Sequence, residues 1–112
     1  MEPRLASSVL VSALIRLAEG QGGFGAVLAS GDATSGAIAV ILLERGVTSR
    51  LFERLLQPDG CYSWAESTPA AEGETGVQRL LERRRRFDPD LWIIELDIAS
   101  AERFAAEMNG LG

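Results

Sequence analysis

The segment GAIAVILLE, residues 36–44, restricts the possible folds more than any other part of the sequence. Successive side chains of a β-strand point to opposite faces of its sheet, and both alternating sets are apolar here. One set is Ile38, Val40 and Leu42, and the other is Ala37, Ala39, Ile41 and Leu43. A strand of this kind fits at the centre of a sheet that is covered on both faces. The sequence therefore predicts helices packed on a sheet.

The remaining elements follow from apolar spacing and turn residues. Helices are expected over 5–20, over 75–87 and over 100–108, the last with Ser100 as its N-cap. Further strands are expected at 24–30, 50–57, 61–66 and 91–97. Residues 50–57 also match a helical period, but the turn residues on either side leave only the length of a strand.

These elements give a single α+β domain over residues 1–112, in the order α-β-β-β-(β)-α-β-α. The sheet is expected to be mainly antiparallel, with four to five strands of which the first three or four form a meander. In the helix at 75–87 the expected buried side chains are Val77, Leu80 and Leu81, with Phe87 as a further candidate.

Composition excludes several kinds of chemistry. All 11 basic residues are arginine, and the chain has neither lysine nor histidine. An imidazole base, a histidine metal ligand, a Schiff base and a phosphate-loop lysine are therefore absent, and no cofactor is expected. The single cysteine, Cys61, cannot form an internal disulfide and is expected to be a small packing residue in a reducing compartment.

Charge and hydropathy argue against two classes of partner. The net charge of −5 repels phosphate backbones and anionic lipid surfaces, so nucleic acid is not expected as a partner. No apolar run reaches the roughly 20 residues of a membrane span. The N-terminal apolar stretch is interrupted by serine and charged residues, unlike a signal peptide. A cytoplasmic protein is the expectation.

The stretch RRRRFDPDLW, residues 83–92, is interpreted as the end of a helix and the start of a strand. Pro89 disfavours helical geometry at Asp88, which ends the helix there. Arginines in a last helical turn interact favourably with the negative end of the helix dipole. Asp88 is expected to form a turn and Asp90 to pair with an arginine. Phosphate binding by the arginines is the alternative, and the candidate binding residues are Arg86, Asp88, Asp90 and Trp92.

Three carboxylates are the candidates for catalysis: Asp32, Glu44 and Glu95. Asp32 lies in the turn-rich segment SGDATSG, where its side chain can accept hydrogen bonds from backbone amides two residues further on. Glu95 interrupts an apolar strand, so it must face solvent or find an arginine. A metal cluster of Asp88, Asp90 and Glu95 is not expected, because alternation places Asp90 and Glu95 on opposite faces of the sheet.

Two segments together resemble a known family. They are FGAVLASGDATSGAIAV, with Gly31, Asp32, Gly36 and Ala37, and RRFDPDLWIIELD, with Arg86, Phe87, Asp88, Pro89, Asp90, Trp92 and Glu95. The paired segments resemble the small bacterial proteins of domain of unknown function family 1491. The resemblance spans nearly the whole chain and implies no activity and no catalytic residues.

Two hypotheses of function remain at this stage. The first is a small non-enzymatic binding or protein-interaction module that binds a protein partner or forms a homodimer, because no catalytic constellation is evident. The second is a metal-assisted hydrolase or nuclease, since helix, three strands, helix and strand is also the core order of restriction-endonuclease-like enzymes. Those enzymes usually pair strand carboxylates with a lysine, so Asp32, Glu44 and Glu95 would have to act with an arginine such as Arg45.

Overall fold

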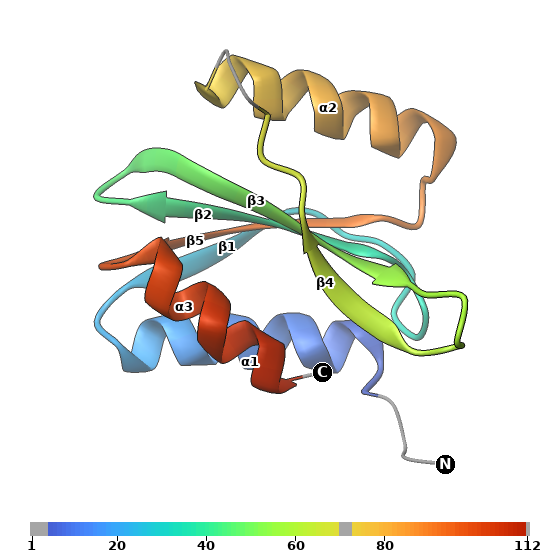
Figure 1. Cartoon of the computed structure of the whole chain (residues 1–112), viewed down its shortest axis with the longest axis horizontal. Helices are drawn as coiled ribbons and strands as arrows, with labels where there is room; N and C mark the ends of the chain where they lie inside the picture. Colours follow the sequence, from blue (N-terminus) through green and yellow to red (C-terminus); the bar gives the residue numbers. More distant parts are fainter. Residues whose placement is uncertain (1–4, 70–72, 112) are drawn as a thin grey trace.

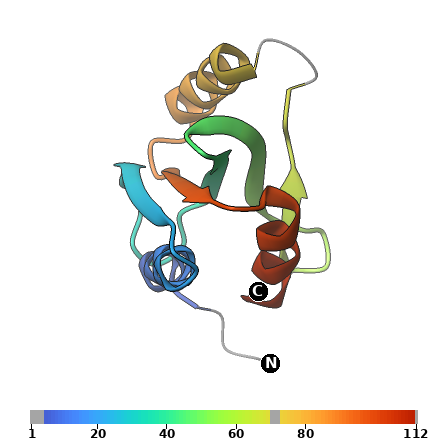
Figure 2. The same ribbon diagram turned by 90° about the vertical axis from the view of Figure 1, so that its left-hand side faces the viewer.

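A five-stranded sheet lies between helices on its two faces (Figures 1 and 2). The computed structural model describes residues 5–69 and 73–111. Its elements are α1 (Ser7–Gly20), β1 (Phe24–Ala29), β2 (Ile38–Glu44), β3 (Val47–Leu56), β4 (Tyr62–Glu66), α2 (Gly73–Phe87), β5 (Trp92–Ile98), α3 (Ala101–Met108) and a final 3-10 turn (Asn109–Leu111). Helices α1 and α3 cover one face and α2 the other, which confirms the predicted α+β class.

The strand order is β1-β5-β2-β3-β4. Every neighbouring pair is antiparallel except β2 and β5, which run parallel. Strands β2, β3 and β4 form the expected meander, but β1 does not pair with the strand that follows it. The chain returns through α2 and inserts β5 between β1 and β2. The part of the expected meander that joined β1 to β2 was therefore wrong, because β5 pairs with both strands and separates them.

Strand β2 has the central position that its double apolar pattern predicts. One face contributes Ile38, Val40 and Leu42 to a core with α1 and α3. The other contributes Ala39 and Ile41 to a smaller core with α2. The sheet therefore separates two hydrophobic layers, and side chains of β2 lie in both.

The β2–β3 hairpin is tighter than the sequence suggested. Glu44 pairs directly with Val47, so the loop is only Arg45 and Gly46. Both have positive φ, 51° and 79°, as a two-residue turn that matches the strand twist requires. Glycine adopts this conformation without strain, which lets β3 begin at Val47 instead of at residue 50. The ambiguous segment 50–57 is confirmed as strand through Leu56.

Two residues expected in the core are on the surface. Helix α2 ends at Phe87, as Pro89 predicted, but Phe87 itself is 81% exposed. It lies on the same side of the helix as half-buried Leu80, not with Val77 and Leu81, which face the sheet. Cys61 is also exposed, because it lies in the β3–β4 turn, where its N–H donates to the Asp59 carboxylate. None of the described helices is long and apolar enough to cross a membrane.

Candidate functional site

Asp32 organises the loop between β1 and β2. Its Oδ2 accepts hydrogen bonds from the Thr34 N–H at 3.2 Å and from the Ser35 N–H at 2.8 Å. The Ser35 hydroxyl donates to the same oxygen. The Ser35 amide, the Ser35 hydroxyl and the Thr34 amide together lower the pKa of Asp32 below its usual value. This is the predicted turn role, and a carboxylate that stays ionised in this way is a poor general base.

The Asp32 loop is joined by hydrogen bonds to the segment around Asp88-Pro89-Asp90, here called the DPD turn. The Asp32 N–H donates to the Asp90 carbonyl at 3.0 Å, and Trp92 Nε1 donates to the Asp32 carbonyl at 2.7 Å. Two glycines permit this approach, since a Cβ at Gly31 or Gly36 would lie 1.9 or 2.3 Å from the Asp90 oxygen. The two segments precede β2 and β5, which are parallel neighbours, so they meet at one end of the sheet.

The DPD turn forms as predicted around Asp88. Its Oδ1 accepts from the Asp90 N–H, and its carbonyl accepts from the Leu91 N–H. The expected ion pair of Asp90 with an arginine is not formed among residues 5–69 and 73–111. Asp90 is instead exposed beside Asp32, because the close backbone contact between the two loops fixes its position.

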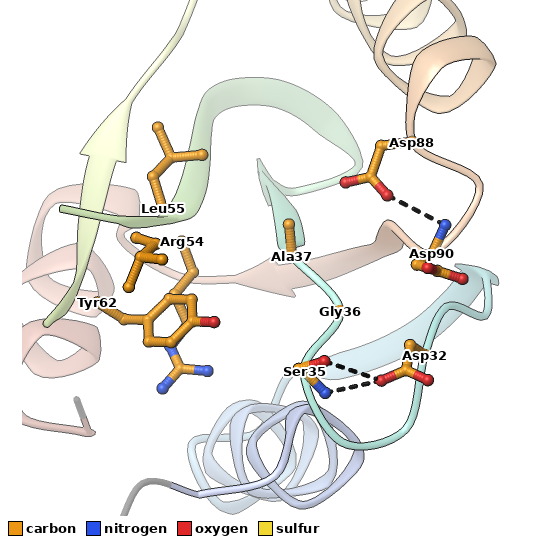
Figure 3. Close-up of a pocket in the computed structure, with 10 residues that line it drawn as sticks. Asp32, Ser35, Gly36, Ala37, Arg54, Leu55, Tyr62, Asp88 and Asp90 are labelled. Carbon is orange, nitrogen blue, oxygen red and sulfur yellow. Dashed lines mark hydrogen bonds between the residues drawn. The ribbon is translucent and has the colours of Figure 1, made fainter. Parts of the chain in front are cut away.

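A pocket of about 230 Å³ opens where these loops meet the end of β3 (Figure 3). Asp32, Asp88 and Asp90 line one side of it, and Arg54 and Tyr62 line the other. The Arg54 guanidinium lies 4.5 Å from the centre of the Tyr62 ring, a cation–π distance. Arg54 is only 5% exposed, so the charged groups of the pocket that solvent reaches are mainly carboxylates.

A second pocket, of about 430 Å³, lies beside the first, between the C-terminal half of α2 and β3. Its apolar lining comes from Ala37, Leu55, Leu80, Phe87 and Leu91, and its polar lining from Glu53, Arg83, Arg84 and Asp88. Ala37, Leu55 and Asp88 line both pockets, which therefore form one continuous surface, here called the paired pockets.

The arginine cluster is held at one point by a buried carboxylate that the sequence interpretation missed. Glu53 is 3% exposed, and its carboxylate lies 3.2 Å from Arg84 Nε and accepts a 2.6 Å hydrogen bond from the Ser67 hydroxyl. Arg85 donates to the Ser30 carbonyl at 3.1 Å. Arg84 and Arg85 thus fix the end of α2 against the sheet and the β1–β2 loop.

Comparisons with known proteins agree with this architecture. The family described as protein of unknown function (DUF1491) matches residues 5–106. The chain belongs to the DUF1491 family. The predicted resemblance is thereby confirmed.

Solved structures of DUF1491 relatives share the fold. An NMR structure of a DUF1491 family protein from Caulobacter crescentus CB15 has 33% identity and a TM-score of 0.79, covering 92% of this chain and 94% of that one. A crystal structure of a DUF1491 family protein from the same organism has 33% identity and a TM-score of 0.76, covering 89% and 94%. The solution structure of protein Atu0922 from A. tumefaciens has 32% identity and a TM-score of 0.76, covering 91% and 92%. A comparison with curated proteins found no match.

The three catalytic candidates of this DUF1491 chain lie apart. Asp32 precedes β2 and Glu44 ends it, so the strand, roughly 20 Å long, separates them. Glu44 accepts a 2.7 Å hydrogen bond from the Ala101 N–H and so stabilises the start of α3. Glu95 lies in the middle of β5, level with Ile41. Within the described residues no three carboxylate or thiol groups could hold a metal ion together. The geometry therefore does not support the hydrolase hypothesis.

Among the candidate binding residues, Asp88 and Asp90 line the first pocket, and Trp92 contacts it only indirectly, through the hydrogen bond from Nε1 to the Asp32 carbonyl. Arg86 lines neither pocket. Arg54 and Tyr62 were missed, although a signal existed. Glu53 and Arg54 are adjacent in the strand next to β2, so their side chains point to opposite faces of the sheet. Because helices were expected on both faces, each of these charged side chains would be buried and would need a partner.

Proposed function

We propose that this chain is a non-enzymatic protein-interaction module that binds its partner at the paired pockets. The observation that carries the proposal is Phe87, 81% exposed at the rim of the 430 Å³ pocket. An aromatic ring in water beside an apolar depression has the character of an interface anchor. Exposed Leu55 and Leu56, which line the paired pockets at the end of β3, extend the apolar surface around it.

The charges around the paired pockets define the partner further. Three carboxylate side chains, those of Asp32, Asp88 and Asp90, line the first pocket, and the whole chain carries a net charge of −5. Electrostatic complementarity favours a partner with a basic side chain, which long-range attraction also steers toward the surface. The partner segment therefore combines an apolar side chain, for the larger pocket, with a lysine or arginine, for the smaller one.

The proposal concerns binding and not chemistry, because the described residues of the pockets include no thiol, imidazole or amine nucleophile. The cytoplasm is its proposed site of action. Exposed Cys61 supports this location, since an unpaired surface thiol suits a reducing compartment.

The test compares two matched variants in affinity capture from the native cell extract, with captured proteins quantified by mass spectrometry. Phe87→Asp removes the aromatic anchor, whereas Val47→Asp makes the same kind of change at another exposed apolar residue, 69% exposed at the opposite end of the sheet. A specific partner should be captured by the wild type and by Val47→Asp, and lost with Phe87→Asp. Capture that Phe87→Asp leaves intact would place the interface elsewhere, and the proposal would be wrong.

A further inference from the structure

Strand β1 forms one edge of the sheet, and its outer side carries no other described element (Figure 2). Its inner side pairs with β5, with a register shift between Val27 and Ala29. An edge strand presents a row of unpaired N–H and C=O groups, which can pair with another extended chain. Helix α2 leaves this edge free, because its principal contacts are with β3 at the other side of the sheet.

The β1 edge lacks the usual protection against pairing. Natural edges are blunted by charged side chains, proline or a covering helix. Residues 24–29, FGAVLA, contain neither charge nor proline. Instead Phe24, Val27 and Leu28 are exposed, with Leu28 54% exposed. A β-bulge also discourages pairing at an edge, and β1 has one between Val27 and Ala29.

The opposite edge differs in these respects. On β4, Glu66 forms an ion pair with Arg50 of β3 at 2.6 Å, and Thr68 donates a hydrogen bond to Glu66 as well. Pairing at β4 would bring the charges of two copies together at the seam, whereas pairing at β1 would not. The apolar and uncharged edge is thus confined to one side of the sheet.

We propose that two copies of this chain associate through antiparallel pairing of β1 with β1 of the second copy. A two-fold axis brings the same patch of both chains together, which gives a closed dimer and not a filament. A second copy is the favoured occupant because the seam itself contains no like charges, although each chain carries −5. The two sheets would then join into one continuous ten-stranded sheet, twice the five strands of one chain.

The size of the edge sets the strength of the dimer. Six paired residues, interrupted by a bulge, give an interface at the low end of protein–protein contacts, below about 1,200 Å². The dimer is therefore weak and depends on concentration. Since the two chains repel each other at long range, screening by salt should strengthen it, the opposite of what an oppositely charged partner would show.

Sedimentation equilibrium tests the proposal on the full chain, from about 10 µM to about 1 mM protein. The weight-average mass should rise from 12.0 kDa toward twice that value, and it should rise further at about 0.5 M salt than at about 0.05 M. Leu28→Lys should keep the mass at that of the monomer. Val47→Lys, with the same change of charge at an exposed apolar residue away from β1, should behave as the wild type.

Amide hydrogen exchange of the wild type provides a test that no substitution can confuse. Amides of β1 should exchange more slowly at about 1 mM than at about 10 µM protein, whereas amides of the other edge, β4, should not change. A mass of 12.0 kDa at every concentration would refute the β1 dimer. So would equal loss of association in Leu28→Lys and Val47→Lys, or equal protection of β1 and β4. Each of these results leaves the paired pockets untouched, so this proposal can fail independently of the proposed function.

Discussion

Replacing Arg84 with glutamine should destabilise the fold by about 2 kcal/mol. The reason is Glu53, whose side chain is 4% exposed and whose charged partner is the Arg84 guanidinium at 3.2 Å. Removing one member of a fully buried pair costs about 3–5 kcal/mol, because the remaining charge is left without a partner. Two features reduce the loss here. The Arg84 side chain is 51% exposed, and the Ser67 hydroxyl continues to donate to Glu53. The remaining cost is that of a hydrogen bond to a charged group, about 1.5–3 kcal/mol.

Urea unfolding monitored by circular dichroism measures this loss of stability. With a slope of about 2 kcal/mol per molar urea, the midpoint of Arg84→Gln should fall by about 1 M. Arg83→Gln is the matched control, since Arg83 forms no ion pair within the described residues and should cost only tenths of a kcal/mol. A double-mutant cycle with Glu53→Gln should show a coupling energy above about 1 kcal/mol. Equal midpoints for Arg84→Gln and Arg83→Gln would refute the argument that burial of Glu53 governs the cost.

Three further predictions concern other parts of the chain. Asp32→Asn should keep the wild-type urea midpoint, because the amide oxygen can accept the same bonds, whereas Asp32→Ala should lower it. The ion pair with Arg50 and a bond from Thr68 lower the pKa of Glu66 from 4.5 to about 2, so its contribution to stability is present above pH 4.5 and lost as pH falls toward 2. Because the Glu66 side chain is 38% exposed, we expect this contribution to the free energy of unfolding to be less than about 1 kcal/mol. Urea unfolding between pH 2 and pH 4.5 should show a weaker dependence of stability on pH for Glu66→Gln than for the wild type. Gly31→Ala should lower the thermal midpoint and cost about 3 kcal/mol, because its Cβ would lie 1.9 Å from a backbone carbonyl oxygen, whereas Gly20→Ala, with nothing within 4 Å, should not.

The parts of the fold that depend on local pattern could be predicted from the sequence. The double apolar alternation of residues 36–44 predicted the central strand, and Pro89 predicted the end of α2. The insertion of β5 between β1 and β2 could not be predicted in this way. It depends on pairing between segments more than 50 residues apart in the chain, which local pattern does not specify.

The candidate site was predicted in pieces. Asp32 and Asp88 were identified from turn chemistry and Asp90 as the partner of an arginine, but their convergence follows from the parallel pairing of β2 and β5, which brings the starts of both strands together. The exposure of Phe87 was missed for a related reason. Helical spacing assigns a side chain to one side of a helix, but only the extent of the sheet beneath decides whether that side is covered.

The position of β5 also bears on how the chain reaches its native state during synthesis. Strands β2, β3 and β4 can pair as soon as they have emerged from the ribosome, because they are successive hairpins. Strand β1 leaves first but has no hydrogen-bonded neighbour until residues 92–98 have been translated. Until then this apolar segment has no place in a sheet, and transiently unpaired strands of this kind are prone to aggregation. The sheet is therefore complete only after β5 has been translated.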